Sequence, residues 1–256
     1  MLLNRTQFIA IGAALVLFIV MYFGCETRPA QVRNLEKSRS LSLEVTGIEN
    51  LMQAARKKLS ASDLATLDAL TASMGEDSVA ALEMLSSKWY ELGDASIAGH
   101  YAEELALLKN DEQSWSIAGT TYLLGLKSAT EDKVRAFCKS KALAAFEKAL
   151  SLNPSNVDHK INKALCFVEM ADENNPMQGI LMLRELNQQH PENVNVMVQL
   201  ARLALKTNQL DRAKERLQQA LSLDPSNNSA NCLMAETLEA AGDTQNAAMY
   251  RSKCKK

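Results

Sequence analysis

Residues 194–227 read VNVMVQLARLALKTNQLDRAKERLQQALSLDPSN, and the next part of the chain repeats their pattern after 34 positions. With this shift, small or apolar residues fall on similar residues: Leu200 on Met234, Ala201 on Ala235, Ala213 on Ala247 and Ala220 on Cys254. Small residues at a fixed interval let two helices approach closely, and the larger apolar ones fill the space between them. The stretch therefore predicts two helices joined by a turn, as one unit of a repeat.

The pattern of this stretch, including the closing Pro225, resembles the tetratricopeptide repeat. The same resemblance is carried upstream by Trp115, Gly119, Tyr122, Ala142, Phe146, Ala149 and Pro154. Between Tyr122 and Ala142 the chain has about eleven residues more than the family pattern. We expect either a loop or a lengthened helix around residues 127–139.

The resemblance implies an all-α fold, an α-solenoid of stacked helix-turn-helix units over residues 77–256. Its units are expected at about 79–110, 111–156, 157–193, 194–227 and 228–256. Gly93 is expected to take a positive-φ conformation in the turn of the first unit. Because each unit leaves apolar surface exposed unless a neighbour covers it, the units are expected to stack with a concave and a convex face.

In this family the first helix of each unit lines a groove that binds a partner peptide or helix. The resemblance implies a groove formed by Thr120, Leu123, Asp158, Ile161, Leu165, Asn195, Val198, Arg202, Lys206, Cys232 and Glu236. Arg202 and Lys206 lie one turn apart and could bind a carboxylate together, or could be two solvated cations. Ile161 and Leu165 stand where chaperone-binding members carry polar side chains, so chaperone binding is not predicted.

Residues 1–25 predict a membrane anchor, because every residue between Arg5 and Glu26 is uncharged. Twenty such residues in a helix reach about 30 Å, the thickness of the hydrocarbon core of a bilayer. Alternatively, Gly24-Cys25 could end a lipoprotein signal, with Cys25 acylated. Basic residues after the segment, such as Arg28 and Arg33, favour repeats on the cytoplasmic side.

Residues 26–76 are expected to form a helical linker or hairpin. Leu41, Val45, Ile48, Met52, Ala55 and Leu59 recur at spacings of three and four, which lines one face of a helix. A second helix is expected to start near Ser62 or Asp63 and to end at Gly75. A hairpin that covers the first unit is favoured over a coiled-coil stalk, because fewer than three full heptads are present.

Composition and motifs argue against several other functions. The 28 Lys and Arg residues are balanced by 30 Asp and Glu residues, so nucleic acid is not an expected partner. No phosphate-binding loop or catalytic signature is present. His100, His159 and His190 are scattered over different units, and each is expected on a helix surface or in a loop. The five cysteines show no CxxC pair and predict neither a metal site nor disulfides. No enzyme activity and no cofactor are predicted.

Three functional hypotheses follow. The first is a membrane-tethered scaffold that binds another protein in its groove, a layout that resembles bacterial membrane-anchored tetratricopeptide proteins. The second is a component of envelope assembly or export, with a lipoprotein as one form of it, whose repeats lie outside the inner membrane. The third is an enzyme with an active site at the insertion, for which only Cys138 is available.

Overall fold

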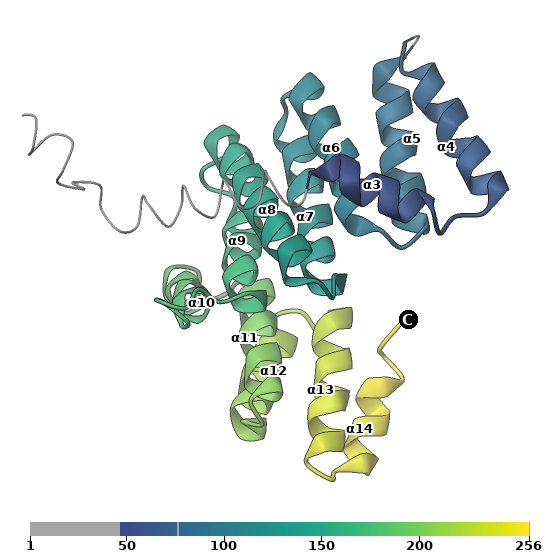
Figure 1. Cartoon of the computed structure of the whole chain (residues 1–256). Coiled ribbons are helices and arrows are strands. Elements are labelled where there is room, and N and C mark those ends of the chain that lie inside the picture. Colours follow the sequence, from purple (N-terminus) through teal and green to yellow (C-terminus); the bar gives the residue numbers. More distant parts are fainter. Residues whose placement is uncertain (1–46, 76, 256) are drawn as a thin grey trace, which may run out of the picture. The chain divides into compact units, whose positions relative to one another are not determined.

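Twelve α-helices account for most of residues 47–75 and 77–255, the part of the chain that the computed structural model describes (Figure 1). Their bounds are α3 Ile48–Arg56, α4 Ala61–Ser73, α5 Ser78–Glu91, α6 Ala95–Lys109, α7 Glu112–Ser128, α8 Asp132–Leu152, α9 Val157–Glu169, α10 Gln178–Gln189, α11 Val194–Lys206, α12 Leu210–Leu223, α13 Asn228–Ala240 and α14 Thr244–Arg251. Within these residues the only β-type pairing is a single bridge between Asp172 and Asn175. The all-α prediction is confirmed for the described residues.

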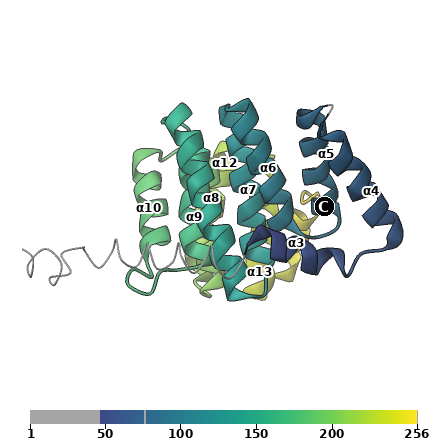
Figure 2. The same ribbon diagram turned by 45° about the horizontal axis from the view of Figure 1, so that its top comes forward.

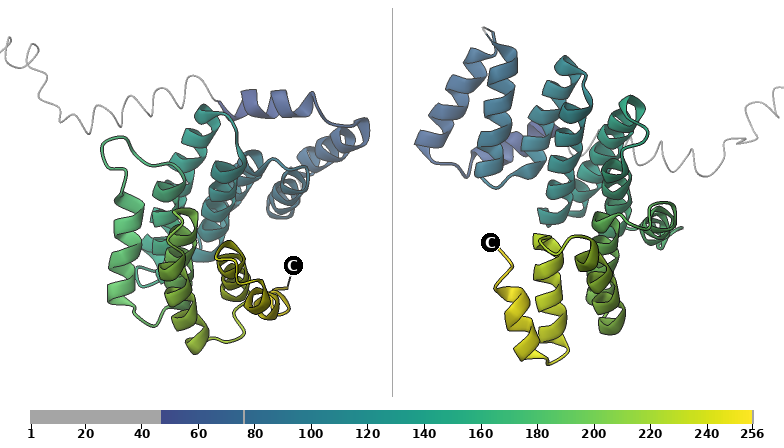
Figure 3. Two further views of the ribbon diagram at one scale, coloured as in Figure 1. Left: turned by 90° about the horizontal axis from the view of Figure 1, so that it is seen from below. Right: turned by 180° about the vertical axis from the view of Figure 1, so that it is seen from behind.

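The helices from α5 onward form consecutive pairs. Helix α5 packs on α6, α7 on α8, α9 on α10, α11 on α12 and α13 on α14, and the second helix of each pair packs on the first helix of the next. Figure 2 shows α5 to α10 as neighbouring, nearly parallel rods, and Figure 3 shows that the later pairs continue the row along a curve. The pairs are stacked as tetratricopeptide-like repeats.

Three turns between paired helices share a left-handed residue. Gly93 has φ 84° between α5 and α6, and Gly242 has φ 81° between α13 and α14. Asn208, which the 34-residue shift places on Gly242, has φ 56° between α11 and α12. Glycine adopts this conformation freely and asparagine tolerates it, so one turn geometry is produced by two residue types.

The pair α7 and α8 shows how the repeat residues pack. Tyr122 and Phe146 are fully buried, and Gly119 lies against the Phe146 ring. A Cβ atom at Gly119 would stand 2.7 Å from that ring, so only glycine fits without a shift. The other predicted packing residues that are buried are Trp115, Ala142, Ala149, Ala201, Ala213, Ala220, Ala235 and Ala247. Pro154 and Pro225 are exposed, in the turns that precede α9 and α13.

The insertion after Tyr122 lengthens both helices instead of forming a long loop. Helix α7 has 17 residues and α8 has 21. Phe137, near the start of α8, packs edge-on against the Tyr122 ring with 5.9 Å between the ring centroids. The guanidinium of Arg135 donates a 2.8 Å hydrogen bond to the carbonyl of Glu169, and Lys139 forms an ion pair with Asp172. The added turns of α8 therefore brace the end of α9 and the loop that follows it.

The helices before the repeats form a small cover on the first pair. Ile48 and Met52 of α3 pack against the cluster that contains Trp89 and Ile97, and Leu67 of α4 is buried in the same cluster. Ser60, one residue before α4, caps that helix by accepting a hydrogen bond from the Asp63 amide. This arrangement agrees with a covering hairpin. Helix α4 starts at Ala61, slightly earlier than the expected Ser62 or Asp63.

The predicted membrane anchor, residues 1–25, and the first part of the predicted helix from Leu41 lie outside the described residues. Among the helices of residues 47–75 and 77–255, none combines the length and the apolar character that crossing a bilayer requires.

Candidate partner-binding surface

The first helices of the repeats present a partly exposed face, but only some of the predicted groove residues lie on it. Six of them are exposed, namely Thr120, Asp158, Asn195, Arg202, Lys206 and Glu236, and Cys232 is half-buried. Four of them are buried in the hydrophobic core, namely Leu123, Ile161, Leu165 and Val198. As the structure places them, these four do not offer a surface to a partner, which corrects the expected groove.

Helix α9 explains this correction. It packs on α8 on one side, on α10 on another, and also directly on α7. Ile161 and Leu165 therefore join the cluster that contains Tyr122 and Phe146. A spacing of four residues shows that two side chains share a helix face, but it does not show how many neighbouring helices cover that face.

A row of charged side chains crosses the carboxyl ends of three first helices. The ammonium group of Lys127 on α7 lies 4.0 Å from Oε1 of Glu169 on α9, and that of Lys206 on α11 lies 3.6 Å from the same atom. Arg202 lies one turn before Lys206 and is exposed, and it has no ion-pair partner among residues 47–75 and 77–255. We call Lys127, Glu169, Arg202 and Lys206 the basic strip.

The amino ends of α7 and α9 carry acidic side chains. Asp158 in the first turn of α9 accepts a 3.0 Å hydrogen bond from the Asn195 side chain in the first turn of α11. Asp111, which caps α7, accepts a 2.7 Å hydrogen bond from the Ser114 amide. Acidic groups at amino ends and basic groups at carboxyl ends both complement the helix dipole. Acidic groups therefore lie at the amino ends of α7 and α9, and basic groups lie at the carboxyl ends of α7 and α11.

A pocket of about 540 Å³ opens at the acidic end, between the starts of α7 and α9. Its lining residues are Asp111, Glu112, Gln113, Ser116, Ile117, Asn156 and His159. His159 is buried, and its Nε2 atom lies 2.8 Å from Oε1 of Glu112. The sequence prediction placed His159 on a helix surface or in a loop, which is wrong because α7 covers it.

Glu112 is the centre of this cluster. Its carboxylate also accepts hydrogen bonds from the side-chain amides of Asn153, at 3.0 Å, and Asn156, at 2.7 Å. The hydrogen bond from Asn153, followed by those from Asn156 and His159, lowers the pKa of the Glu112 carboxyl. Both asparagines belong to the turn between α8 and α9, so the carboxylate fastens this turn to the start of α7.

Ser116, His159 and Glu112 follow one another as a serine, a histidine and a carboxylate would in a hydrolase. The Ser116 hydroxyl, however, lies 3.5 Å from Nδ1 of His159. A nucleophile and its base are normally about 2.6–3.2 Å apart. With its carboxylate holding three side-chain donors, the cluster acts as a structural tie between two units.

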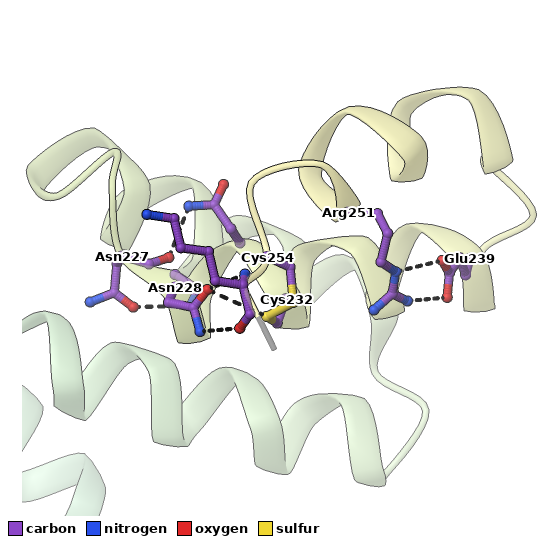
Figure 4. Close-up of a disulfide and its surroundings, with 9 residues drawn as sticks. Asn227, Asn228, Cys232, Glu239, Arg251 and Cys254 are labelled. Carbon is purple, nitrogen blue, oxygen red and sulfur yellow. Dashed lines mark hydrogen bonds and ion pairs between the residues drawn. A yellow bond between two sulfur atoms is a disulfide. The ribbon is translucent and has the colours of Figure 1, made fainter.

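The last unit contains a disulfide between Cys232 on α13 and Cys254 after α14, with their Cα atoms 4.9 Å apart (Figure 4). The prediction that no cysteine is paired is therefore wrong for these two residues. The 34-residue shift aligns Cys254 with the buried Ala220, but α14 ends at Arg251 and the chain turns back toward α13. Residues separated by 22 positions meet because of this turn.

The two other described cysteines are buried thiols. Burial raises the pKa of the Cys138 thiol to about 11 and that of the Cys166 thiol to about 12. A thiol with such a pKa is protonated at neutral pH and is a poor nucleophile. Cys138 therefore gives no support to an active site at the insertion. Within residues 47–75 and 77–255, no group of three His, Cys, Asp or Glu side chains could hold a metal ion.

Stacked helix pairs with a charged face on their first helices define the described region as an α-helical repeat array with a candidate binding surface. Comparison with protein families gives the type of repeat: residues 170–236, from the loop before α10 into α13, match the family model named Tetratricopeptide repeat. This part of the chain therefore carries tetratricopeptide repeats. A comparison with curated proteins found no match.

Several solved structures are similar to this chain. One is MamA, residues 41 to the end, from Desulfovibrio magneticus RS-1, which is 18% identical with a TM-score of 0.40 and aligns over 70% of this chain and 93% of that one. Another MamA crystal structure is 14% identical with a TM-score of 0.39, over 69% and 89% of the two chains. The third is YrrB, described as a TPR protein with an unusual peptide-binding site, at 15% identity and a TM-score of 0.37, over 73% and 91%. At these TM-scores the likeness does not extend to a site or a partner.

Proposed function

We propose that this chain is a membrane-tethered scaffold that captures a partner protein on the exposed face of its first helices. The observation that carries the proposal is the basic strip, which joins three successive units through Lys127, Glu169 and Lys206. Helical repeat arrays bind their partners on extended surfaces of this kind. The uncharged segment after Arg5 supports the tether.

The basic strip favours a partner segment that presents a carboxylate. Arg202 can donate two parallel hydrogen bonds to a carboxylate, and Lys206 lies one turn away. Lys206 is only partly engaged by Glu169, because the lysine side chain is 56% exposed and the separation is 3.6 Å. An exposed ion pair of this kind contributes about 0–1 kcal/mol, so a partner can replace it with little loss of stability.

A pair of charge reversals tests this surface. The Arg202→Glu/Lys206→Glu variant should lose its partner in a cross-linking pull-down from native membranes, while its unfolding midpoint changes little. The matched control is Arg212→Glu/Lys214→Glu, which makes the same charge change at two exposed positions of the second helix α12. If both double variants retain the same partner, or both lose it, the basic strip is not the contact.

The disulfide favours the second hypothesis, in which the repeats lie outside the inner membrane. Disulfides persist in oxidising compartments such as the bacterial periplasm and are rare in the cytosol. The count of basic residues after the anchor favours the opposite side, but long domains are exported regardless of such charges. Among these observations we give the pairing of Cys232 with Cys254 the greater weight.

Trapping thiols in intact cells tests the compartment. Cells are treated with N-ethylmaleimide before lysis, and the purified chain is digested without reductant. For repeats in an oxidising compartment, the peptides that contain Cys232 and Cys254 should be recovered joined to each other. Recovery of both peptides mainly as maleimide adducts would place the repeats in a reducing compartment.

A further inference from the structure

The C-terminal tail, residues 252–255, turns back from α14 to α13 and pairs with it through Lys255. The side chain of Asn228 accepts a 2.6 Å hydrogen bond from the main-chain N–H of Lys255 and donates a 2.9 Å hydrogen bond to the carbonyl of the same residue. A primary amide that pairs with both main-chain groups of one residue reads the peptide backbone and not the side chain. The contact is therefore independent of the lysine that happens to be there.

The disulfide holds this contact in place. Cys232 lies one helical turn after Asn228 on α13, and Cys254 directly precedes Lys255 (Figure 4). On the same helix, Glu239 forms a 2.6 Å ion pair with Arg251 at the end of α14. The end of α14 and the tail are fixed to α13 at three successive points.

We propose that Asn228 is the recognition residue of a main-chain binding site for an extended peptide, and that the tail occupies this site while the Cys232–Cys254 disulfide is closed. This site rests on the proposed function: it adds α13 to the partner-binding surface, and the group that it recognises is the peptide main chain. The occupant that replaces the tail is an extended peptide segment of a partner protein.

Opening the site requires reduction of the disulfide. A dithiol supplies two electrons and two protons. Its thiolate attacks one sulfur of the disulfide, which releases one cysteine and forms a mixed disulfide with the other. The second thiol of the reductant then attacks this mixed disulfide and releases the second cysteine, so that both cysteines become thiols and the dithiol becomes a disulfide. Apart from its turn hydrogen bonds to the end of α14, the tail after Arg251 is then held to α13 only by the two hydrogen bonds to Asn228. An incoming peptide can compete for these bonds once the covalent tie is absent.

Disulfide tethering tests the recognition step without any partner protein. The full chain with Cys254→Ser, which leaves Cys232 free, is equilibrated in 2-mercaptoethanol with acetyl-Lys-Cys-Lys-amide. A second sample receives the same peptide N-methylated at the main-chain nitrogen of its second lysine, which corresponds to the nitrogen of Lys255. The unmethylated peptide should form the mixed disulfide at Cys232 about ten-fold more, as expected for one hydrogen bond to a main-chain donor. Peptide mapping by mass spectrometry separates this adduct from adducts at the other cysteines.

A second substitution separates recognition from reactivity. In the Cys254→Ser/Asn228→Ala chain the preference between the two peptides should disappear. Equal capture of both peptides by the Cys254→Ser chain, or a preference that survives Asn228→Ala, would overturn the recognition step. Neither result bears on the basic strip, so the scaffold proposal would stand.

Hydrogen exchange tests whether the disulfide holds the tail on α13. The main-chain amide of Lys255 should exchange at least about ten-fold faster in the Cys254→Ser chain than in the oxidised chain, because the tail can then leave α13. Unchanged exchange would show that the tail stays bound without the disulfide, and would overturn the role of the disulfide as the control.

Discussion

The Nε2 atom of His159 lies 2.8 Å from Oε1 of Glu112, although 47 positions separate the two residues in the chain. Glu112 is the first residue of α7, and His159 lies in the first turn of α9. The same carboxylate holds Asn153 and Asn156. One side chain at the start of a unit thus fixes the turn that leads into the next unit.

The acid stability of the protein should depend on Glu112. Its pKa is lowered in the folded state, from an ordinary value of 4.5. A lowered pKa gives stability that is present above the unfolded-state value and is lost as the pH falls through the folded-state value. Between about pH 5 and pH 3, the urea midpoint of the native protein should therefore fall more than that of the Glu112→Gln variant. The variant Glu173→Gln, at an exposed position, should behave like the native protein. An equal fall of the urea midpoint in all three proteins would contradict the prediction.

Enlarging a small residue between paired helices should destabilise the array. Ala213 is fully buried between α11 and α12, so Ala213→Leu should lower the free energy of unfolding by about 1–3 kcal/mol through overpacking. Ala248→Leu makes the same change at an exposed position of α14 and serves as the control. Chemical denaturation measures both variants. A midpoint for Ala213→Leu as high as that of the control would show that the repeat register is misassigned.

Gly119→Ala should destabilise the protein even though alanine is the better helix former. In an open helix position this change would stabilise by about 1 kcal/mol. Here the new Cβ atom would meet the Phe146 ring at 2.7 Å. The Phe146→Leu substitution should reduce the cost of Gly119→Ala, which a double-mutant cycle measures as a coupling energy. Additive effects of the two substitutions would rule out this contact as the cause.

Cys138 and Cys166 should resist alkylation in the native protein. Burial raises the pKa of the Cys138 thiol to about 11 and that of the Cys166 thiol to about 12. Iodoacetamide reacts with the thiolate, so at about pH 8 both residues should react only after denaturation. Mass spectrometry of the two peptides, with and without urea, gives the result. Rapid native labelling of Cys138 would restore the possibility of a reactive thiol at the insertion.

The repeat spacing was sufficient to predict the helix pairs, because the residues that set it act locally. Gly93 and Gly242 occupy left-handed turns, and Ala213 and Ala220 are buried where two helices meet. Such residues report on their own turn and on the partner helix of the same unit. The lengthened helices at the insertion were one of two predicted outcomes, and the burial of Phe137 against Tyr122 decides between them.

The binding surface was harder to predict, because it depends on contacts between units. Ile161 and Leu165 share a face with the exposed Asp158, yet α7 and neighbouring helices cover them. The tie between Glu112 and His159 and the disulfide join residues 47 and 22 positions apart, without any local motif. Only the path of the chain brings these groups together.

The long hairpin of α7 and α8 also has a mechanical consequence. A stack of helix pairs bends like a spring, and its compliance at each joint depends on the interface between neighbours. Arg135 and Lys139 add contacts from α8 to the end of α9 and to the loop beyond it, while one continuous hydrophobic cluster runs from Tyr122 to Leu200. Bending at this joint must therefore separate the Arg135 and Lys139 contacts as well as the hydrophobic cluster that crosses it.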